Sequence, residues 1–135
     1  MEVLLLRRAF SAAGINVPIE FVRDGQEAVD YLESRTPQVD HPGRPLPTVL
    51  LLDLKMPRLN GFDVLRWIRQ QPGLRRLLVV IFSSSTESED INLAYDLGAN
   101  SYLRKPHHFE ELQGLAKTLE DYWLKTNLPP AFATG

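Results

Sequence analysis

A polar residue that can take part in chemistry follows each of three short apolar runs. Asp53 ends the run 48–52, Ser83 follows the run 77–82, and Lys105 follows the run 101–104. If these runs are parallel strands, their carboxyl ends lie at one edge of a sheet, where open α/β sheets bind their ligands. A carboxylate, a hydroxyl and an ammonium would then share one crevice. Each type alone is common in loops, but three at successive strand ends indicate a functional site.

The segments between these runs have the apolar periodicity of amphipathic helices. Helices are expected over 2–13, around 28–32, around 62–68, over 87–97 with Ser85 or Thr86 as cap, and over 109–124. A further strand is expected at 19–22, and the proline-rich stretch 34–47 is expected to be a loop. The continuous apolar character of 48–52 and 77–82 is typical of strands covered on both faces. Alternating strands and helices predict a parallel sheet with helices on both sides.

Composition narrows the class of protein. The chain has 135 residues, no cysteine and a formal net charge of -2, which favours one domain and excludes disulfides and thiolate chemistry. No apolar run reaches the roughly 18 residues that a membrane helix needs. We expect a cytoplasmic protein with no nucleic-acid or membrane partner. The arginines near the third helix are interpreted as a solvated face; they are Arg66, Arg69, Arg75 and Arg76.

The residues around the three strand ends form a longer pattern. The segment LLLDLKMPRLNGFDVL carries Asp53, Met56-Pro57 and Gly61; Ser83 stands thirty residues after Asp53, and Lys105-Pro106 follows after another twenty-two. This pattern resembles the receiver domains of bacterial two-component response regulators, over residues 2–130. The segments AYDLGANSYLRKP and EDYWLKTNLPP resemble stand-alone receivers that partner phytochrome kinases.

The resemblance implies a doubly wound, flavodoxin-like α/β fold and a role in signal transfer. Asp53 would accept a phosphoryl group from a histidine of a sensor kinase, possibly a phytochrome. Lys105 would hold one phosphoryl oxygen and Ser83 another. A magnesium ion would bind Asp53 and the main-chain carbonyl of Lys55. Such a protein is not an enzyme, beyond self-catalysed phosphotransfer and autodephosphorylation.

The resemblance also assigns the moving parts of a switch. Tyr102, three residues before the lysine, occupies the position of the switch aromatic. It would rotate as Ser83 moves towards the phosphoryl group. Pro106 would follow a cis peptide bond.

Two alternatives remain open. The sequence begins within what resembles the family's first helix, so the first strand and its acidic pair have no counterpart. A receiver without that pair could act as a phosphorylation-independent pseudo-receiver or scaffold. A phosphatase of the haloacid-dehalogenase type also uses an aspartate at a strand end, but it needs a second acid two residues later, where this chain has Lys55.

The carboxyl-terminal residues favour self-association. An apolar run, 128–132, follows a helix that ends in Tyr122, Trp123 and Leu124. A single domain of this size would not ordinarily leave so much aromatic surface in water. We therefore expect residues 1–125 to form one receiver domain and 126–135 a tail. Trp123 and Phe132 are expected in a homodimer interface, which would use the face of the fourth and last helices.

Overall fold

The computed structural model describes residues 3–15, 24–35, 46–55 and 59–130, without the side chains of residues 3–7. Several predictions fall outside these residues. They concern the strand at 19–22, most of the loop 34–47, Met56-Pro57 and Phe132.

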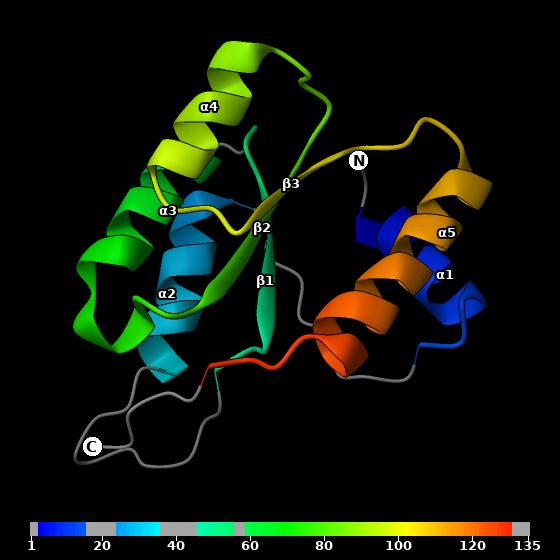
Figure 1. The fold of residues 1–135 in the computed structure, drawn as a ribbon, viewed down its shortest axis with the longest axis horizontal. Coiled ribbons are helices and arrows are strands. Elements are labelled where there is room, and N and C mark those ends of the chain that lie inside the picture. Colours follow the sequence, from blue (N-terminus) through cyan, green and yellow to red (C-terminus); the bar gives the residue numbers. More distant parts are fainter. Residues whose placement is uncertain (1–2, 16–23, 36–45, 56–58, 131–135) are drawn as a thin grey trace.

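Three parallel strands form the sheet at the centre of the described chain (Figure 1). They are β1 (Val49–Asp53), β2 (Leu78–Ser83) and β3 (Ser101–Arg104), in the spatial order β1-β2-β3. Asp53 pairs with Phe82, and Ser83 pairs with Arg104. The carboxyl ends of the three strands therefore meet at one edge, which confirms the predicted parallel sheet and the shared position of the polar residues.

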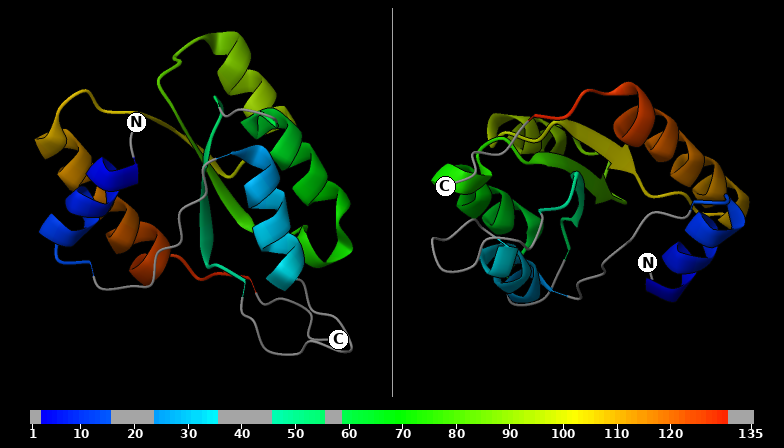
Figure 2. Two further views of the ribbon diagram at one scale, coloured as in Figure 1. Left: turned by 180° about the vertical axis from the view of Figure 1, so that it is seen from behind. Right: turned by 90° about the horizontal axis from the view of Figure 1, so that it is seen from below.

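Helices cover the sheet on both sides (Figures 1 and 2). Helices α2 (Gly25–Arg35) and α3 (Gly61–Gln70) pack together on one side, while α1 (Val3–Ala12) and α5 (Phe109–Leu119) pack together on the other. Helix α4 (Ser88–Asp96) contacts β3. A short 3-10 turn, η1 (Pro72–Leu74), leads into β2. This layered arrangement confirms the predicted doubly wound α/β class.

The two sides of the sheet are unequally packed. The larger core lies on the α2–α3 side and includes Leu52, Ile81 and Leu65, whereas the buried residues of the other cluster are Ala9, Phe82 and Leu112. Strand β2 is buried along its whole length, as predicted. In β1 only Leu52 is buried, but Leu50 packs against the larger cluster and Leu51 against the smaller one. The expectation that this strand is covered on both faces is therefore confirmed only in part. Among the described strands β1 lies at an edge, and the smaller cluster covers it incompletely.

The ends of the helices agree only partly with the sequence patterns. Gly98, with φ of +102°, follows α4 in the left-handed conformation that glycine adopts readily. Helix α4 begins at Ser88 with Glu87 at the cap position, and no side-chain hydrogen bond is formed by that cap. The predicted cap at Ser85 or Thr86 is therefore wrong, although the Ser85 hydroxyl accepts a hydrogen bond from the Glu87 N–H at 3.2 Å.

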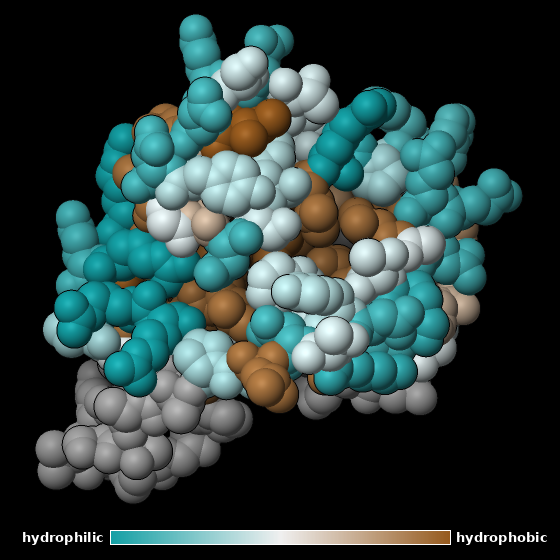
Figure 3. Space-filling view, in the orientation of Figure 1, coloured by the Kyte–Doolittle hydropathy of each residue, from teal (hydrophilic) through white to brown (hydrophobic). Residues whose placement is uncertain are grey.

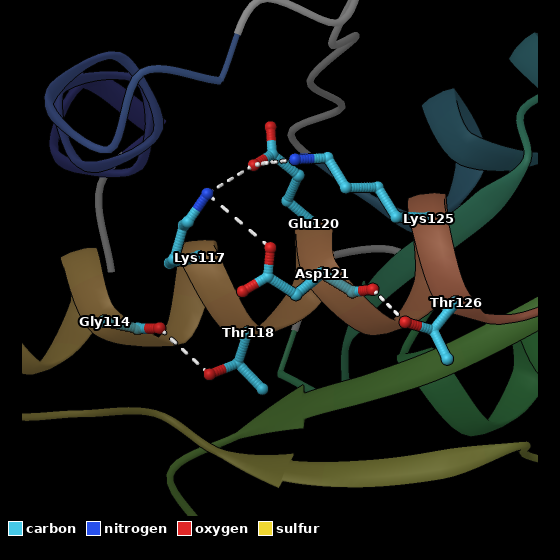
Figure 4. A network of polar contacts seen from close by, with 7 residues as sticks. All are labelled: Gly114, Lys117, Thr118, Glu120, Asp121, Lys125 and Thr126. Atoms are coloured by element: carbon cyan, nitrogen blue, oxygen red, sulfur yellow. Dashed lines mark hydrogen bonds and ion pairs between the residues drawn. The ribbon is translucent and has the colours of Figure 1, made fainter.

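The last helix is not α-helical to its end. After α5 the chain widens into a π-helix, η2 (Glu120–Thr126), in which the Asn127 N–H donates to the Tyr122 carbonyl five residues earlier. The Glu120 carboxylate accepts from Lys117 at 3.0 Å and from Lys125 at 3.3 Å (Figure 4). These ion pairs lie at the change from α-helix to π-helix. Because the α-helix ends at Leu119, the prediction of one α-helix over 109–124 is corrected.

Candidate functional site

An ion pair joins the ends of β1 and β3. The Lys105 Nζ donates to the Asp53 Oδ2 at 2.5 Å. The lysine side chain is 12% exposed and the aspartate side chain 29% exposed. The ammonium also lies 5.8 Å from the centre of the Phe82 ring, and Phe82 is the β2 partner of Asp53 in the sheet. The lysine therefore reaches across the end of β2 to neutralise the carboxylate.

The other carboxylate oxygen is bound by the loop that follows β1. The Lys55 N–H donates to the Asp53 Oδ1 at 3.0 Å. Each oxygen of Asp53 thus has a defined partner, one main-chain amide and one ammonium. These contacts hold the carboxylate in one orientation at the edge of the sheet.

Gly61 allows helix α3 to begin directly against the end of β1. Its N–H donates to the Leu54 carbonyl at 3.1 Å. A Cβ at this position would lie 2.8 Å from the Leu54 Cα and would collide with the main-chain carbonyl of Asp53. Asn60 caps the helix through its side-chain oxygen, which accepts from the Asp63 N–H at 2.9 Å. The glycine of the sequence motif is therefore needed for a close approach of two main chains.

Ser83 is buried at the end of β2, with 1% of its surface exposed. Its Oγ accepts a hydrogen bond from the Ser85 N–H at 3.1 Å, and its carbonyl accepts from the Lys105 N–H at 2.8 Å. Within the described chain the Ser83 hydroxyl bonds to Ser85 and not to the Asp53 carboxylate. The three predicted residues meet at one edge, with the ion pair of Asp53 and Lys105 as the direct contact.

Tyr102 lies next to this edge, on β3. Its hydroxyl donates to the Ser85 carbonyl at 2.9 Å. Ser85 therefore contacts Ser83 and Tyr102, the two residues to which the family resemblance assigns the switch. Nothing in the sequence pattern singled out Ser85 for more than a helix cap, because its role depends on which loop atoms the fold brings together.

The peptide bond before Pro106 is trans, because no cis peptide bond occurs in the described part of the chain. The prediction of a cis bond at Pro106 is therefore wrong for this structure. Trans is the intrinsically favoured isomer of an X–Pro bond by about 0.5–1 kcal/mol. Lys105 reaches Asp53 with the trans isomer in place.

Asp53 brings a carboxylate to the edge that the described residues form. They contain no group of three or more histidine, cysteine, aspartate or glutamate side chains placed to hold a metal ion. Magnesium is commonly held by one or two carboxylates together with water and phosphate oxygens. The carboxylate of Asp53 and the nearby main chain at Lys55 fit that donor set; the ligand role of the Lys55 carbonyl stays a prediction.

Arg69 is a second residue whose role the sequence did not reveal. Its guanidinium donates to four acceptors at 2.6–3.1 Å, which are the carbonyls of Gly98, Arg75 and Leu77 and the side-chain oxygen of Asn100. Burial lowers the pKa of this guanidinium. The interpretation of Arg69 as part of a solvated face is therefore wrong. It lies four residues after the buried Leu65, and this spacing could have placed it on the inner face.

An open groove of about 380 Å³ lies between β3 and the end of the last helix. Its lining residues are Asn100, Ser101, Leu103, Thr118, Leu119, Tyr122 and Trp123. Figure 3 shows apolar surface in a hollow between the α4 side and the α5 side of the same face. Trp123 is half-buried and packs edge-on against Tyr122, with ring centres 5.0 Å apart. The predicted interface residue Trp123 thus lines an accessible groove.

Comparison with known proteins identifies the class. Residues 3–117 match the response regulator receiver domain, and the chain therefore belongs to this family of two-component signalling proteins, whose members interact with histidine kinases and are generally not classical enzymes. The chain is 39% identical over 129 residues to the probable methanogenesis regulatory protein FilR2 of Methanothrix harundinacea, covering 96% of this chain and 81% of that protein.

No helix in the described residues is long and apolar enough to cross a membrane.

Solved structures of response regulators are similar in fold and sequence. The phosphorylated cyanobacterial phytochrome response regulator RcpA superposes with a TM-score of 0.81 at 33% identity, covering 96% of this chain and 90% of that chain. The Mn²⁺-bound form of the response regulator Rcp1 gives a TM-score of 0.77 at 31% identity, covering 93% and 91%. Rcp1 of Synechocystis is thus a relative whose structure holds a divalent ion.

Proposed function

We propose that Asp53 accepts a phosphoryl group from a histidine of a sensor kinase and that the chain then changes its contacts with other proteins. The observation that carries this proposal is the ion pair between Asp53 and Lys105 at the edge of the sheet. An Asp53 oxygen would attack the phosphorus in line. A P–O bond forms as the P–N bond to the kinase histidine breaks, and the imidazole leaves with the electron pair.

Lys105 and Ser83 would stabilise the charge of the transferred group. The ammonium now bound to the carboxylate would bind a phosphoryl oxygen instead, as a partly buried point charge. The Ser83 Oγ accepts from Ser85, and a hydroxyl can still donate its own proton while it accepts. That proton is available for a second phosphoryl oxygen.

A magnesium ion is proposed at the Asp53 carboxylate and the Lys55 carbonyl. When bound, it would neutralise negative charge on the phosphoryl oxygens and the carboxylate. The Asp53 carboxylate and the adjacent main chain of Lys55 support this proposal, as does the divalent ion in a relative's structure. Lys55 would contribute through its main chain, since its N–H already orients the carboxylate.

The response to phosphorylation is proposed to run through Ser83 and Tyr102. Movement of Ser83 towards the phosphoryl group would open space at the end of β2. Tyr102 would rotate into that space and change the face formed by α4, β3 and α5. The kinase is proposed to be phytochrome-type, in the cytoplasm, and this is supported by the likeness to phytochrome response regulators.

A homodimer is proposed on that face, formed by a receiver domain of residues 1–125 with a tail at 126–135. Trp123 in the groove and Tyr122, which is 49% exposed, support it; Phe132 is proposed as the tail's contact. A chain truncated after Lys125 should sediment as a weaker dimer than the full chain. Identical monomeric behaviour of both across micromolar concentrations would remove the tail and Phe132 from the interface.

A phosphorylation-independent receiver is the second candidate function. The observation in its favour is that Lys105 already neutralises Asp53, and that the described residues contain no group of three or more side chains placed to hold a metal ion. Such a protein would act through surface contacts alone and would not form an aspartyl phosphate.

One experiment separates the two candidates. The chain is incubated with acetyl phosphate and Mg²⁺, and its intact mass is measured. Phosphoryl acceptance predicts an adduct of about 80 Da in the wild type and none in Asp53→Asn, because the amide is not nucleophilic. Asp63→Asn, at a half-exposed carboxylate of helix α3, is the matched control and should label like the wild type. Absence of an adduct in all three proteins would favour the phosphorylation-independent receiver.

A further inference from the structure

We propose that the Ser85 side chain couples the phosphoryl-accepting edge of the sheet to the first turn of helix α4. The inference rests on the proposed phosphoryl acceptance at Asp53 and assigns Ser85 as a positioning residue for the switch. Ser85 lies two residues after Ser83, in the loop between β2 and α4.

Every polar group of Ser85 is hydrogen-bonded. Its N–H donates to the Ser83 Oγ at 3.1 Å, and its carbonyl accepts from the Tyr102 hydroxyl at 2.9 Å. Its own hydroxyl donates to the Asp90 Oδ2 at 2.6 Å and accepts from the Glu87 N–H at 3.2 Å. One residue therefore contacts the end of β2, the middle of β3 and the start of α4.

The contact with Asp90 is the strongest of these links by its chemistry. A hydroxyl bound to a carboxylate at 2.6 Å is a short, charge-assisted hydrogen bond. Glu87 occupies the cap position of α4 but forms no side-chain cap bond. The Ser85 hydroxyl, in the loop before the helix, therefore hydrogen-bonds the start of α4. It accepts from the Glu87 N–H and donates to the Asp90 carboxylate.

The opposite end of α4 is held by a different contact. The Arg69 guanidinium donates twice to the Gly98 carbonyl, at 2.6 and 3.0 Å, and also donates to the Leu77 carbonyl just before β2. This clamp ties the end of α4 to α3 and to the start of β2. The two ends of the helix are thus anchored differently: the first turn is linked to Ser83 through Ser85, and the far end is bound by Arg69.

The direction of coupling follows from these bonds. The Ser83 hydroxyl can donate to a phosphoryl oxygen while it still accepts from the Ser85 N–H. A shift of Ser83 towards Asp53 would then draw Ser85 with it. The Ser85 hydroxyl would transmit that shift to Asp90 and the first turn of α4, while the Arg69 clamp keeps the other end in place.

Hydrogen exchange of the α4 segment 88–96, with and without beryllium fluoride and Mg²⁺, tests the coupling. The phosphoryl mimic should change the exchange rate of this segment in the wild type, and the change should shrink by about fivefold in Ser85→Ala, the scale of one lost hydrogen bond. Asp90→Ala removes the acceptor and should reproduce this loss. Ser85→Thr retains the hydroxyl and should restore the response, and Ser88→Ala, an exposed serine of the same turn, should respond like the wild type.

Intact mass after acetyl phosphate treatment distinguishes the two ways in which the inference can fail. Ser85→Ala should form the adduct to the same extent as the wild type, because a purely positioning residue does not bind the phosphoryl group. Normal adduct formation with a full α4 response in Ser85→Ala would overturn the coupling alone. The coupling alone would also be overturned if the wild type forms the adduct but the hydrogen-exchange rate of α4 does not change. Failure of the wild type to form an adduct would overturn phosphoryl acceptance, and with it this coupling.

Discussion

The Lys105 ammonium donates to the Asp53 carboxylate at 2.5 Å across 52 positions of sequence. Asp53 is the last residue of β1 and Lys105 directly follows β3, and strand β2 lies between those two strands in the sheet. The parallel sheet therefore creates the charge pair, because it aligns three carboxyl ends that are distant in the chain. The pair places a cation where a phosphoryl oxygen on Asp53 would need one.

A double-mutant cycle should detect this pair as a net interaction. Asp53→Asn and Lys105→Met are each expected to lower the free energy of unfolding by about 1–2 kcal/mol, with a coupling energy of about 1 kcal/mol, because both side chains are partly shielded from water. Urea unfolding of the four proteins measures it. The exposed pair Asp63 and Arg66 is the control and should couple by less than about 0.5 kcal/mol. Equal coupling in both pairs would contradict a structural role for the partly buried pair of Asp53 and Lys105.

Lys105→Ala should separate phosphorylation from the response to it. The variant should still form some adduct with acetyl phosphate, since Asp53 remains nucleophilic, but beryllium fluoride should no longer alter hydrogen exchange of α4. The reason is that the proposed contact of the ammonium with a phosphoryl oxygen would be lost. Arg104→Ala removes the exposed cation next to it and should keep the response. A full response in Lys105→Ala would exclude Lys105 as the sensor.

The Arg69 clamp should contribute strongly to stability. Arg69→Met leaves the carbonyls of Gly98 and Leu77 without their donor and is expected to cost about 2–4 kcal/mol of unfolding free energy. Arg66→Met, one turn earlier on the exposed face, should stay within about 0.5 kcal/mol of the wild type. Arg69→Lys should recover little, because an ammonium cannot span the same acceptors. Thermal and urea denaturation measure all three, and equal losses in Arg69→Met and Arg66→Met would refute the clamp.

The network of Glu120 should make stability depend on pH on the acid side. The hydrogen bond from Lys117 is the first cause that lowers the pKa of the Glu120 carboxyl, and the bond from Lys125 adds to it. A carboxyl whose pKa is lowered by folding stabilises the fold above its ordinary pKa, about 4.3, and this contribution disappears as the pH falls through the lowered pKa. Urea midpoints of the wild type should therefore fall between pH 6 and pH 3 by more than those of Glu120→Gln. Parallel decreases in both proteins would show that the network does not contribute.

Sequence patterns predicted the parts of this structure that depend on strand direction and burial. The continuous apolar run before Ser83 is a buried strand, and Asp53, Ser83 and Lys105 lie at one edge because parallel strands align their ends. The patterns did not reveal the roles of Ser85 and Arg69. Both act through hydrogen bonds to main-chain atoms of other segments, and those positions are set only by the tertiary fold.

The corrections to the last helix and to the peptide bond before Pro106 also arise from features that the tertiary fold determines. Periodicity does not distinguish an α-helix from the π-helix at Glu120–Thr126, because a segment of seven residues is too short to show a period of its own. The isomer of the bond before Pro106 depends on how the chain returns from β3 towards α5, so sequence alone could not determine it.

Chemical localisation of the phosphoryl group tests the central claim most directly. The chain is treated with acetyl phosphate and Mg²⁺, reduced with borohydride, digested and mapped by mass spectrometry. Borohydride converts an aspartyl phosphate to homoserine, so the account predicts that the peptide containing Asp53 becomes about 14 Da lighter and that all other peptides keep their mass. An unchanged Asp53 peptide, or a loss of mass at another carboxylate, would contradict the assignment of Asp53 as the phosphoryl acceptor.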